Sequence, residues 1–128
     1  GHLVLRGGSQ GSNYHLEAVQ EAAAELSQAG LQDRLMVDCS HANSNKDFRR
    51  QADVLGSVAE QLRGGSNHVM GVMIESHLVE GNQKLTADLS QLTYGQSITD
   101  ACISLETTEV LLSQLAEAVS DCSRVVTA

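Results

Sequence analysis

The residues with the clearest chemical potential are a histidine and two carboxylates, His41, Glu75 and Asp100. Two of them have ordinary alternatives, since His41 could be a capping or core histidine and Asp100 could cap or start the final segment. Glu75 is harder to explain in that way, because it directly follows the apolar run 69–74 and a buried carboxylate needs a partner or a metal. An imidazole together with carboxylates suits Mn, Fe or Zn. The joint pattern therefore predicts a divalent metal site.

A second group of residues could bind an anion beside such a metal. Arg6 ends the first apolar run and is followed by Gly7, Gly8 and Gly11. A glycine-rich loop after a strand permits close approach of an anion to the backbone. The ordinary alternatives are a solvated or salt-bridged arginine and a simple glycine turn. Asp38, at the end of the second apolar run, could in turn orient a histidine ligand.

Short apolar runs are the elements that must position these residues. Residues 3–5, 35–37 and 69–74 are rich in Leu, Val and Met without clean polar alternation, which is typical of strands covered on both faces. Between the first two runs, apolar residues recur at helical spacing over 16–29, and Gly30 suits a left-handed cap. The beginning of the chain is therefore predicted to alternate strand and helix.

Two further helices are predicted after the second and third runs. One begins near Asp47, with Ser44 or Asn45 as its N-cap, and stops at a pair of glycines. The last begins near Thr108 with Thr107 as its cap. The side chains of this last helix that are expected to face the core are Val110, Leu111, Leu115, Ala118, Val119 and Cys122.

The order of these elements predicts where a ligand binds. Alternating strands and helices imply a parallel sheet with right-handed crossovers. In such sheets ligands bind at the carboxyl ends of the strands, where the loops meet. The segment 76–99 is a long loop rich in Gly, Asn, Gln and Ser, and long ordered loops are usually functional. The strand-end residues are therefore expected on one rim.

Charge and composition exclude several classes of protein. The chain has 128 residues, with 8 Lys+Arg against 16 Asp+Glu and a net charge of −8, which argues against binding to nucleic acid. No apolar run approaches the roughly 18 residues of a membrane span. The cysteines have no Cys-x-x-Cys spacing, so neither a disulfide framework nor a zinc knuckle is expected. The expected location of the protein is therefore the reducing cytoplasm. Cys39 is predicted to lie in the core, and Cys102 and Cys122 to be small apolar helix residues.

Four longer motifs are specific enough to suggest a family. They are L-R-G-G at 5–8, V-D-C-S-H-A-N-S-N-K-D-F-R-R-Q at 37–51, G-V-M-I-E-S-H-L-V-E-G-N-Q at 71–83 and Y-G-Q-S-I-T-D-A-C-I at 94–103. Together they closely resemble class I 3-deoxy-D-arabino-heptulosonate 7-phosphate (DAHP) synthase, the enzyme entering the shikimate pathway of aromatic amino acid biosynthesis. The resemblance runs from His2 to about Val119.

The resemblance implies a fold and a reaction. The family fold is an α/β (β/α)8 TIM barrel, and this chain looks like about its last three βα units, so residues 1–128 would be the C-terminal part of one barrel domain. The family condenses phosphoenolpyruvate with erythrose 4-phosphate, releases phosphate and uses a divalent metal (Mn, Fe, Co or Zn). The full-length enzyme is expected to be a homo-oligomer.

By the same resemblance, His41, Glu75 and Asp100 are metal ligands, His41 and Asp100 act in catalysis, and Arg6 binds phosphoenolpyruvate. The fourth family ligand is a cysteine that nothing here matches. A barrel takes about 250 residues, so the abrupt start at Gly1 is expected to be a cut inside the barrel and the isolated chain to have little or no activity. The alternatives are the related 3-deoxy-octulosonate 8-phosphate synthase, which uses arabinose 5-phosphate, and a non-catalytic α/β fragment that binds metal or phosphate.

Overall fold

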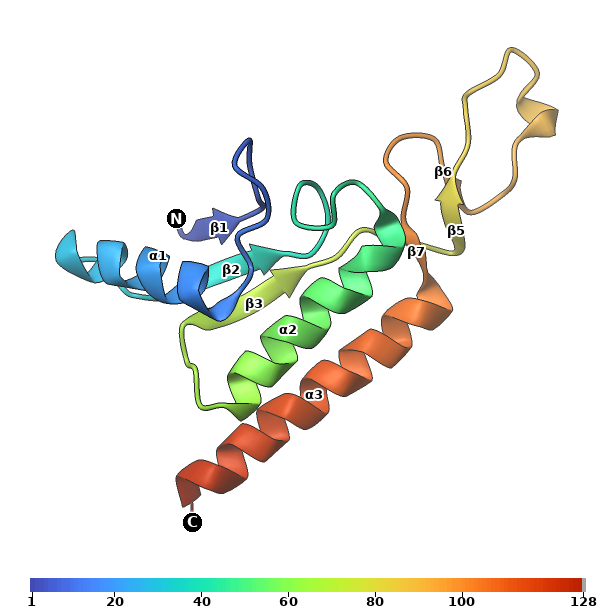
Figure 1. Ribbon diagram of the computed structural model, residues 1–128. Coiled ribbons are helices and arrows are strands. Elements are labelled where there is room, and N and C mark those ends of the chain that lie inside the picture. The colour runs from blue at the N-terminus through green and yellow to red at the C-terminus, as the bar shows by residue number, and fades with distance from the viewer. Residues whose placement is uncertain (128) are drawn as a thin grey trace.

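Three parallel strands form the central sheet of the computed structural model, which describes the backbone of residues 1–127 and the side chains of residues 1–123 (Figure 1). The strands are β1 (Leu3–Leu5), β2 (Leu35–Asp38) and β3 (Val69–Met73), in the order β1-β2-β3. The predicted strands and their parallel pairing are confirmed. The structure thus has the α/β class that the sequence predicts, whereas closure into a (β/α)8 barrel stays a prediction.

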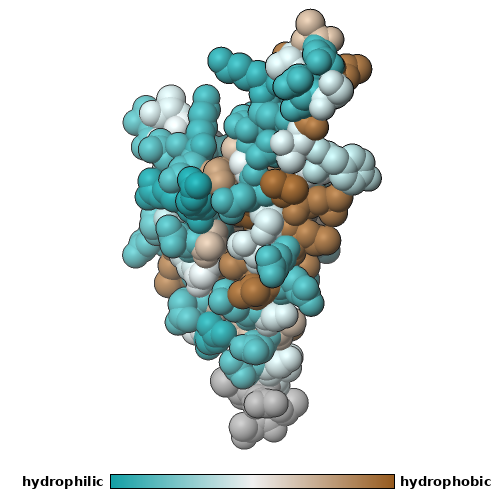
Figure 2. Space-filling model, turned by 90° about the vertical axis from the view of Figure 1, so that its right-hand side faces the viewer, coloured by the Kyte–Doolittle hydropathy of each residue, from teal (hydrophilic) through white to brown (hydrophobic). Residues whose placement is uncertain are grey.

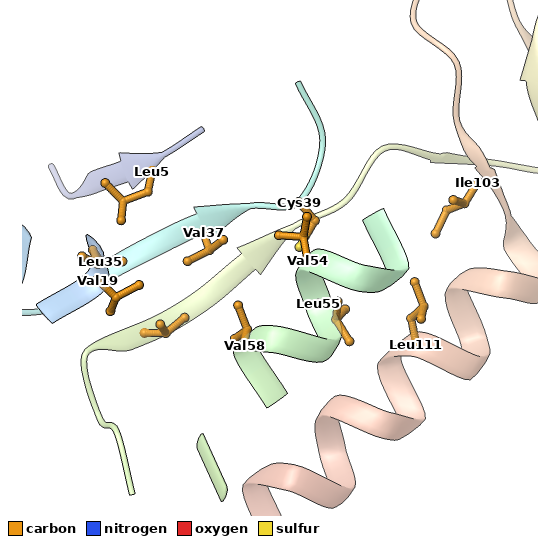
Figure 3. Close-up of a cluster of buried hydrophobic side chains, with 11 residues drawn as sticks. Leu5, Val19, Leu35, Val37, Cys39, Val54, Leu55, Val58, Ile103 and Leu111 are labelled. Carbon is orange, nitrogen blue, oxygen red and sulfur yellow. The ribbon is translucent and has the colours of Figure 1, made fainter. Parts of the chain in front are cut away.

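The register of the sheet sends alternate side chains to opposite faces. Leu5 lies opposite Val37 on the neighbouring strand, and Asp38 lies opposite Met73. One face carries the apolar core, in which Val37 is fully buried (Figure 3). The core residues that Figure 3 labels are Leu5, Val19, Leu35, Val37, Cys39, Val54, Leu55, Val58, Ile103 and Leu111. The prediction that Cys39 packs in the core is confirmed.

Three helices follow the three strands. Helix α1 (Leu16–Gln28) ends as expected before Gly30, which has a positive φ of 73°. Helix α2 (Gln51–Arg63) packs on the core face of the sheet, and α3 (Leu105–Thr127) runs alongside α2 (Figure 1). Within residues 1–127, no helix is both long enough and apolar enough to span a membrane.

The beginnings of α2 and α3 differ from the prediction. A 3-10 turn, η1 (Phe48–Arg50), precedes α2, and the Asp47 side chain caps it by accepting a hydrogen bond from the Arg49 backbone N–H, so neither Ser44 nor Asn45 is the N-cap. Helix α3 begins at Leu105, because the Ser104 hydroxyl accepts the Thr107 backbone N–H at 3.1 Å and caps the helix earlier than predicted.

The inward face of α3 is also narrower than predicted. Leu111 and Ala118 are buried, but Val110 and Val119 are 55 % and 51 % exposed and do not face the core. The reason is that α3 packs chiefly on α2, so one narrow stripe of its surface is covered. Figure 2 shows apolar side chains gathered on the face of the molecule below the arm at its top.

That arm is formed by the long segment after β3. It contains β4 (Ser76–His77), β5 (Val79–Asn82), the 3-10 turn η2 (Leu89–Gln91) and β6 (Gln96–Ser97), and it leads back to β7 (Ile103–Ser104). β4 pairs with β7 and β5 with β6, both in parallel. Cys102 lies here in an extended bridge to Gly81, not in a helix as predicted. The arm projects from the carboxyl ends of the sheet strands (Figure 1).

Candidate metal centre

The three residues predicted to bind a metal meet at the carboxyl ends of the strands. His41 lies in the loop after β2, Glu75 lies two residues after β3, and Asp100 closes the arm before β7. One nitrogen of His41 and one carboxylate oxygen each of Glu75 and Asp100 lie within 4.8 Å of one another. The Nε2 atom of His41 is 3.8 Å from Glu75 Oε1. We call these three residues the triad.

Asp38 orients the histidine of the triad. Its carboxylate is almost fully buried, and its Oδ2 atom lies 2.7 Å from Nδ1 of His41. The other oxygen, Oδ1, accepts the Ser40 backbone N–H at 2.8 Å. A neutral imidazole that donates its Nδ1–H to Asp38 presents the lone pair of Nε2 toward Glu75, which is the form in which an imidazole binds a metal.

Ser40 orients the carboxylate of Glu75. The Ser40 hydroxyl donates to Glu75 Oε2 at 2.5 Å, while the other oxygen, Oε1, faces the imidazole of His41. A carboxylate held in this way presents one defined oxygen to a cation. Sequence analysis did not single out Ser40, because a serine after a strand is common and only its distance from Glu75 gives it this role.

Asn43 joins the loops that carry Arg6 and His41. Its side chain is buried and donates to the backbone carbonyls of Leu5, at 3.0 Å, and Asp38, at 2.9 Å. It also accepts the backbone N–H of Asn13 at 2.8 Å. A single amide thus fixes the ends of two strands relative to each other, another contact that the sequence pattern did not indicate.

The loop after β2 has a strained backbone around the triad. His41, Asn45 and Lys46 have positive φ angles of 48°, 54° and 59°. Residues other than glycine rarely adopt this left-handed backbone conformation. Each residue held in it by its surroundings lowers the stability of the fold by an amount of the order of 1–3 kcal/mol. Hydrogen bonds that close the loop include the one from Lys46 N to His41 O at 2.9 Å. Strain of this kind is typical of functional sites.

A cavity of about 240 Å³ opens beside the triad. It is lined by the triad and by Arg6, Ser40, Lys46, Phe48 and Ala101. Arg6 and Lys46 supply positive charge, and neither forms an ion pair in the part of the chain that the structure describes. Lys46 was not predicted as a site residue, since nothing local in the sequence distinguishes it from a surface lysine.

Two buried thiols lie near this rim. Burial raises the pKa of Cys39 to about 12, and the carboxylate of Asp38 adds to the shift. Burial also raises the pKa of Cys102, assisted by the nearby charge of Glu75. Both are therefore protonated at neutral pH, and among the described residues no cysteine joins the triad as a fourth ligand atom.

Comparisons with known proteins agree on one family. The sequence model of the DAHP synthetase I family matches residues 1–113. The chain is 51 % identical over 118 residues to a phospho-2-dehydro-3-deoxyheptonate aldolase of Haemophilus influenzae and 52 % identical over 118 residues to the Phe-sensitive enzyme of Escherichia coli. Each match covers 92 % of this chain, but 32 % and 33 % of those relatives.

A solved structure with the same name, from Francisella tularensis SCHU S4, superimposes with a TM-score of 0.90 at 47 % sequence identity. The match covers 95 % of this chain and 35 % of that one. The chain thus spans about a third of the length of these three relatives.

Proposed function

The chain belongs to the DAHP synthetase I family, as its motifs predict, and from this premise we propose that it supplies the metal-binding rim of a phospho-2-dehydro-3-deoxyheptonate aldolase. The reaction proposed for the whole enzyme is the condensation of phosphoenolpyruvate with erythrose 4-phosphate. The observation that carries this proposal is the meeting of His41, Glu75 and Asp100 beside Arg6, which forms no ion pair with any residue that the structure describes. Relatives about 50 % identical to the chain are named phospho-2-dehydro-3-deoxyheptonate aldolase, after a seven-carbon product. Because phosphoenolpyruvate supplies three of these carbons, the name favours the four-carbon erythrose 4-phosphate over the five-carbon arabinose 5-phosphate.

The triad fits a divalent cation. It offers one imidazole nitrogen and two carboxylate oxygens within 4.8 Å of one another, a donor set that suits Mn, Fe, Co or Zn. When bound, such a metal supplies Lewis-acid polarisation of the aldehyde oxygen. Polarisation is useful here because phosphoenolpyruvate is a weak carbon nucleophile.

The remaining roles fall to the side chains that line the cavity. Arg6 would bind the phosphate or carboxylate of phosphoenolpyruvate through two parallel hydrogen bonds. Asp100 is solvent-exposed at the mouth of the site, where it would orient a sugar hydroxyl or a water molecule in addition to its role as ligand. The hydrogen bond between Nδ1 of His41 and Asp38 would hold the imidazole so that Nε2 points toward Glu75 and the cation.

These residues alone are a poor match for the two substrates. The substrates together carry two phosphates and a carboxylate, whereas Arg6 and Lys46 are the only cations among the described residues that line the cavity. The described ligand set also has three members and no cysteine. We therefore expect the chain on its own to bind metal but to turn over little or no substrate. We propose that the rest of the barrel in the complete enzyme supplies the other cations, and that the complete enzyme is a homo-oligomer.

The proposal is tested by titrating the chain with Mn²⁺ and measuring the concentration of free Mn²⁺ from its electron paramagnetic resonance signal. His41→Ala should lower the affinity at least about 10-fold, since it removes a ligand outright. His77→Ala is the matched control, because His77 is exposed and outside the triad. Equal binding by the His41→Ala variant and the unmodified chain would show that the ligand set is wrong.

A coupled assay of phosphoenolpyruvate consumption tests the expectation that the chain alone turns over little or no substrate. The purified chain with Mn²⁺ and erythrose 4-phosphate is expected to give no turnover above the protein-free rate. Robust turnover by the chain alone would contradict the argument from the missing cations.

A further inference from the structure

A buried glutamine at the start of α2 holds the backbone of Glu75. Gln51 is fully buried, and its Nε2 donates to the Glu75 carbonyl at 3.1 Å. Its Oε1 accepts the Glu75 backbone N–H at 2.8 Å. We infer that Gln51 is a positioning residue for the Glu75 ligand, an inference that rests on the proposed metal site.

Glu75 needs such a partner because the sheet ladder ends before it. β3 stops at Met73, whose carbonyl accepts the last ladder bond from Cys39 N at 2.9 Å. Beyond that point the Glu75 carbonyl also accepts Ile103 N at 3.0 Å, but among the described residues Gln51 alone accepts the Glu75 N–H. The carboxamide therefore takes the place of the missing neighbouring strand.

Gln51 can hold a fixed position because the helix behind it is anchored. The residues on the same face of α2 include Val54, Leu55 and Val58, which are buried in the core against the sheet (Figure 3). A side chain locked by packing on a rigid helix transmits that rigidity to the residue that it bonds. The core and the metal site are thereby connected through one amide.

The backbone and side chain of Glu75 are held from two sides. Gln51 fixes the backbone, and Ser40 fixes the carboxylate through Oε2. Oε1 is then left 3.8 Å from Nε2 of His41. With Gln51 removed, the backbone N–H loses its partner and the strand end is held by fewer hydrogen bonds, so the distance from Oε1 to the imidazole is less tightly fixed.

The inference predicts a specific loss of metal affinity. Gln51→Met keeps the length of the side chain and removes both hydrogen bonds. Replacing a residue that supports a ligand from outside typically lowers metal affinity about 10–100-fold, and the same range is expected for Mn²⁺ here. The Glu75 amide proton should also exchange faster with deuterium in this variant.

The matched control is Gln61→Met. Gln61 lies on the same helix and is also buried, but its amide donates to the Tyr14 carbonyl and the Ser57 hydroxyl, not to the triad. Both variants remove a buried amide from α2, so a merely structural role would change their Mn²⁺ affinities equally. The expected result is weaker binding in Gln51→Met and unchanged binding in Gln61→Met.

The outcomes separate this inference from the proposed function. If the unmodified chain binds no Mn²⁺, the metal site itself is refuted, and this inference with it. If the unmodified chain binds Mn²⁺ and the folded Gln51→Met variant binds it within 2-fold, only the positioning role is overturned. If circular dichroism shows that Gln51→Met is unfolded, Gln51→Asn is tested in its place. This variant keeps the amide but makes the side chain one methylene too short to reach Glu75. Unchanged Mn²⁺ affinity in Gln51→Asn overturns the inference.

Discussion

The buried thiol of Cys39 makes the stability of the chain sensitive to alkaline pH. Cys39 follows β2, is fully buried and belongs to the apolar core. Burial first, and then the neighbouring charge of Asp38, raises its pKa from the ordinary 9.0 to about 12. The folded chain therefore holds this proton more tightly than the unfolded chain does.

The sign and size of the effect follow from that difference. Below pH 9 the thiol is protonated in both states and the stability it contributes is fully present. Above pH 9 the unfolded chain releases the proton while the folded chain retains it, so the free energy of unfolding falls by about 1.4 kcal/mol per pH unit. At pH 10 the loss from this thiol is about 1.4 kcal/mol, and the loss stops growing near pH 12.

Urea unfolding followed by circular dichroism at pH 7.5, 9 and 10 measures this loss. Cys39→Ala should be less stable than the unmodified chain at neutral pH, but its stability should fall less between pH 7.5 and 10, by about 1.4 kcal/mol. Cys122→Ala, a half-buried cysteine on α3, is the control and should keep the full fall. Parallel falls in the unmodified chain and in Cys39→Ala would refute the reasoning.

Four other substitutions test the core, the loops and the metal site. Leu55→Ala, in the fully buried core, should lower the free energy of unfolding by about 2–5 kcal/mol in urea titrations. Gly7→Ala should cost at least about 1–3 kcal/mol, because Gly7 has a φ of 75° and an added Cβ would lie 2.8 Å from the facing backbone; Gly8→Ala, with open space around it, should change stability little. Asp38→Asn should weaken Mn²⁺ binding about 10–100-fold by misorienting His41, and unchanged affinity would contradict that role.

Local sequence pattern predicted the strands and much of the helical structure because each depends on nearby residues. The run 35–37 is apolar on both faces and became the central strand, and the spacing over 16–29 became α1. The order of strands and helices also predicted which residues meet at the carboxyl-terminal edge of the sheet. Parallel strands place their carboxyl ends at one edge, so residues following β2 and β3, such as His41 and Glu75, had to lie near each other.

Helix boundaries were less predictable because they depend on which side chain finds a free N–H. Thr107 and Ser104 are both good caps by residue type. The structure uses Ser104, whose hydroxyl accepts the Thr107 N–H, and α3 therefore starts at Leu105. The prediction that Cys102 lies in a helix is wrong for a similar reason, since a small apolar residue near a helical pattern gives no sign of a bridge to Gly81.

The residues that support the triad were decided by tertiary structure alone. Gln51 and Glu75 are 24 residues apart, and Ser40 and Glu75 are 35 apart. No periodicity links such positions, because a hydrogen bond between distant side chains depends on the packing of α2 against the sheet. The sequence by itself thus determined which residues meet and at which edge of the sheet. Only the folded chain determined how His41 and Glu75 are held, since that requires atoms from separate elements within 3 Å.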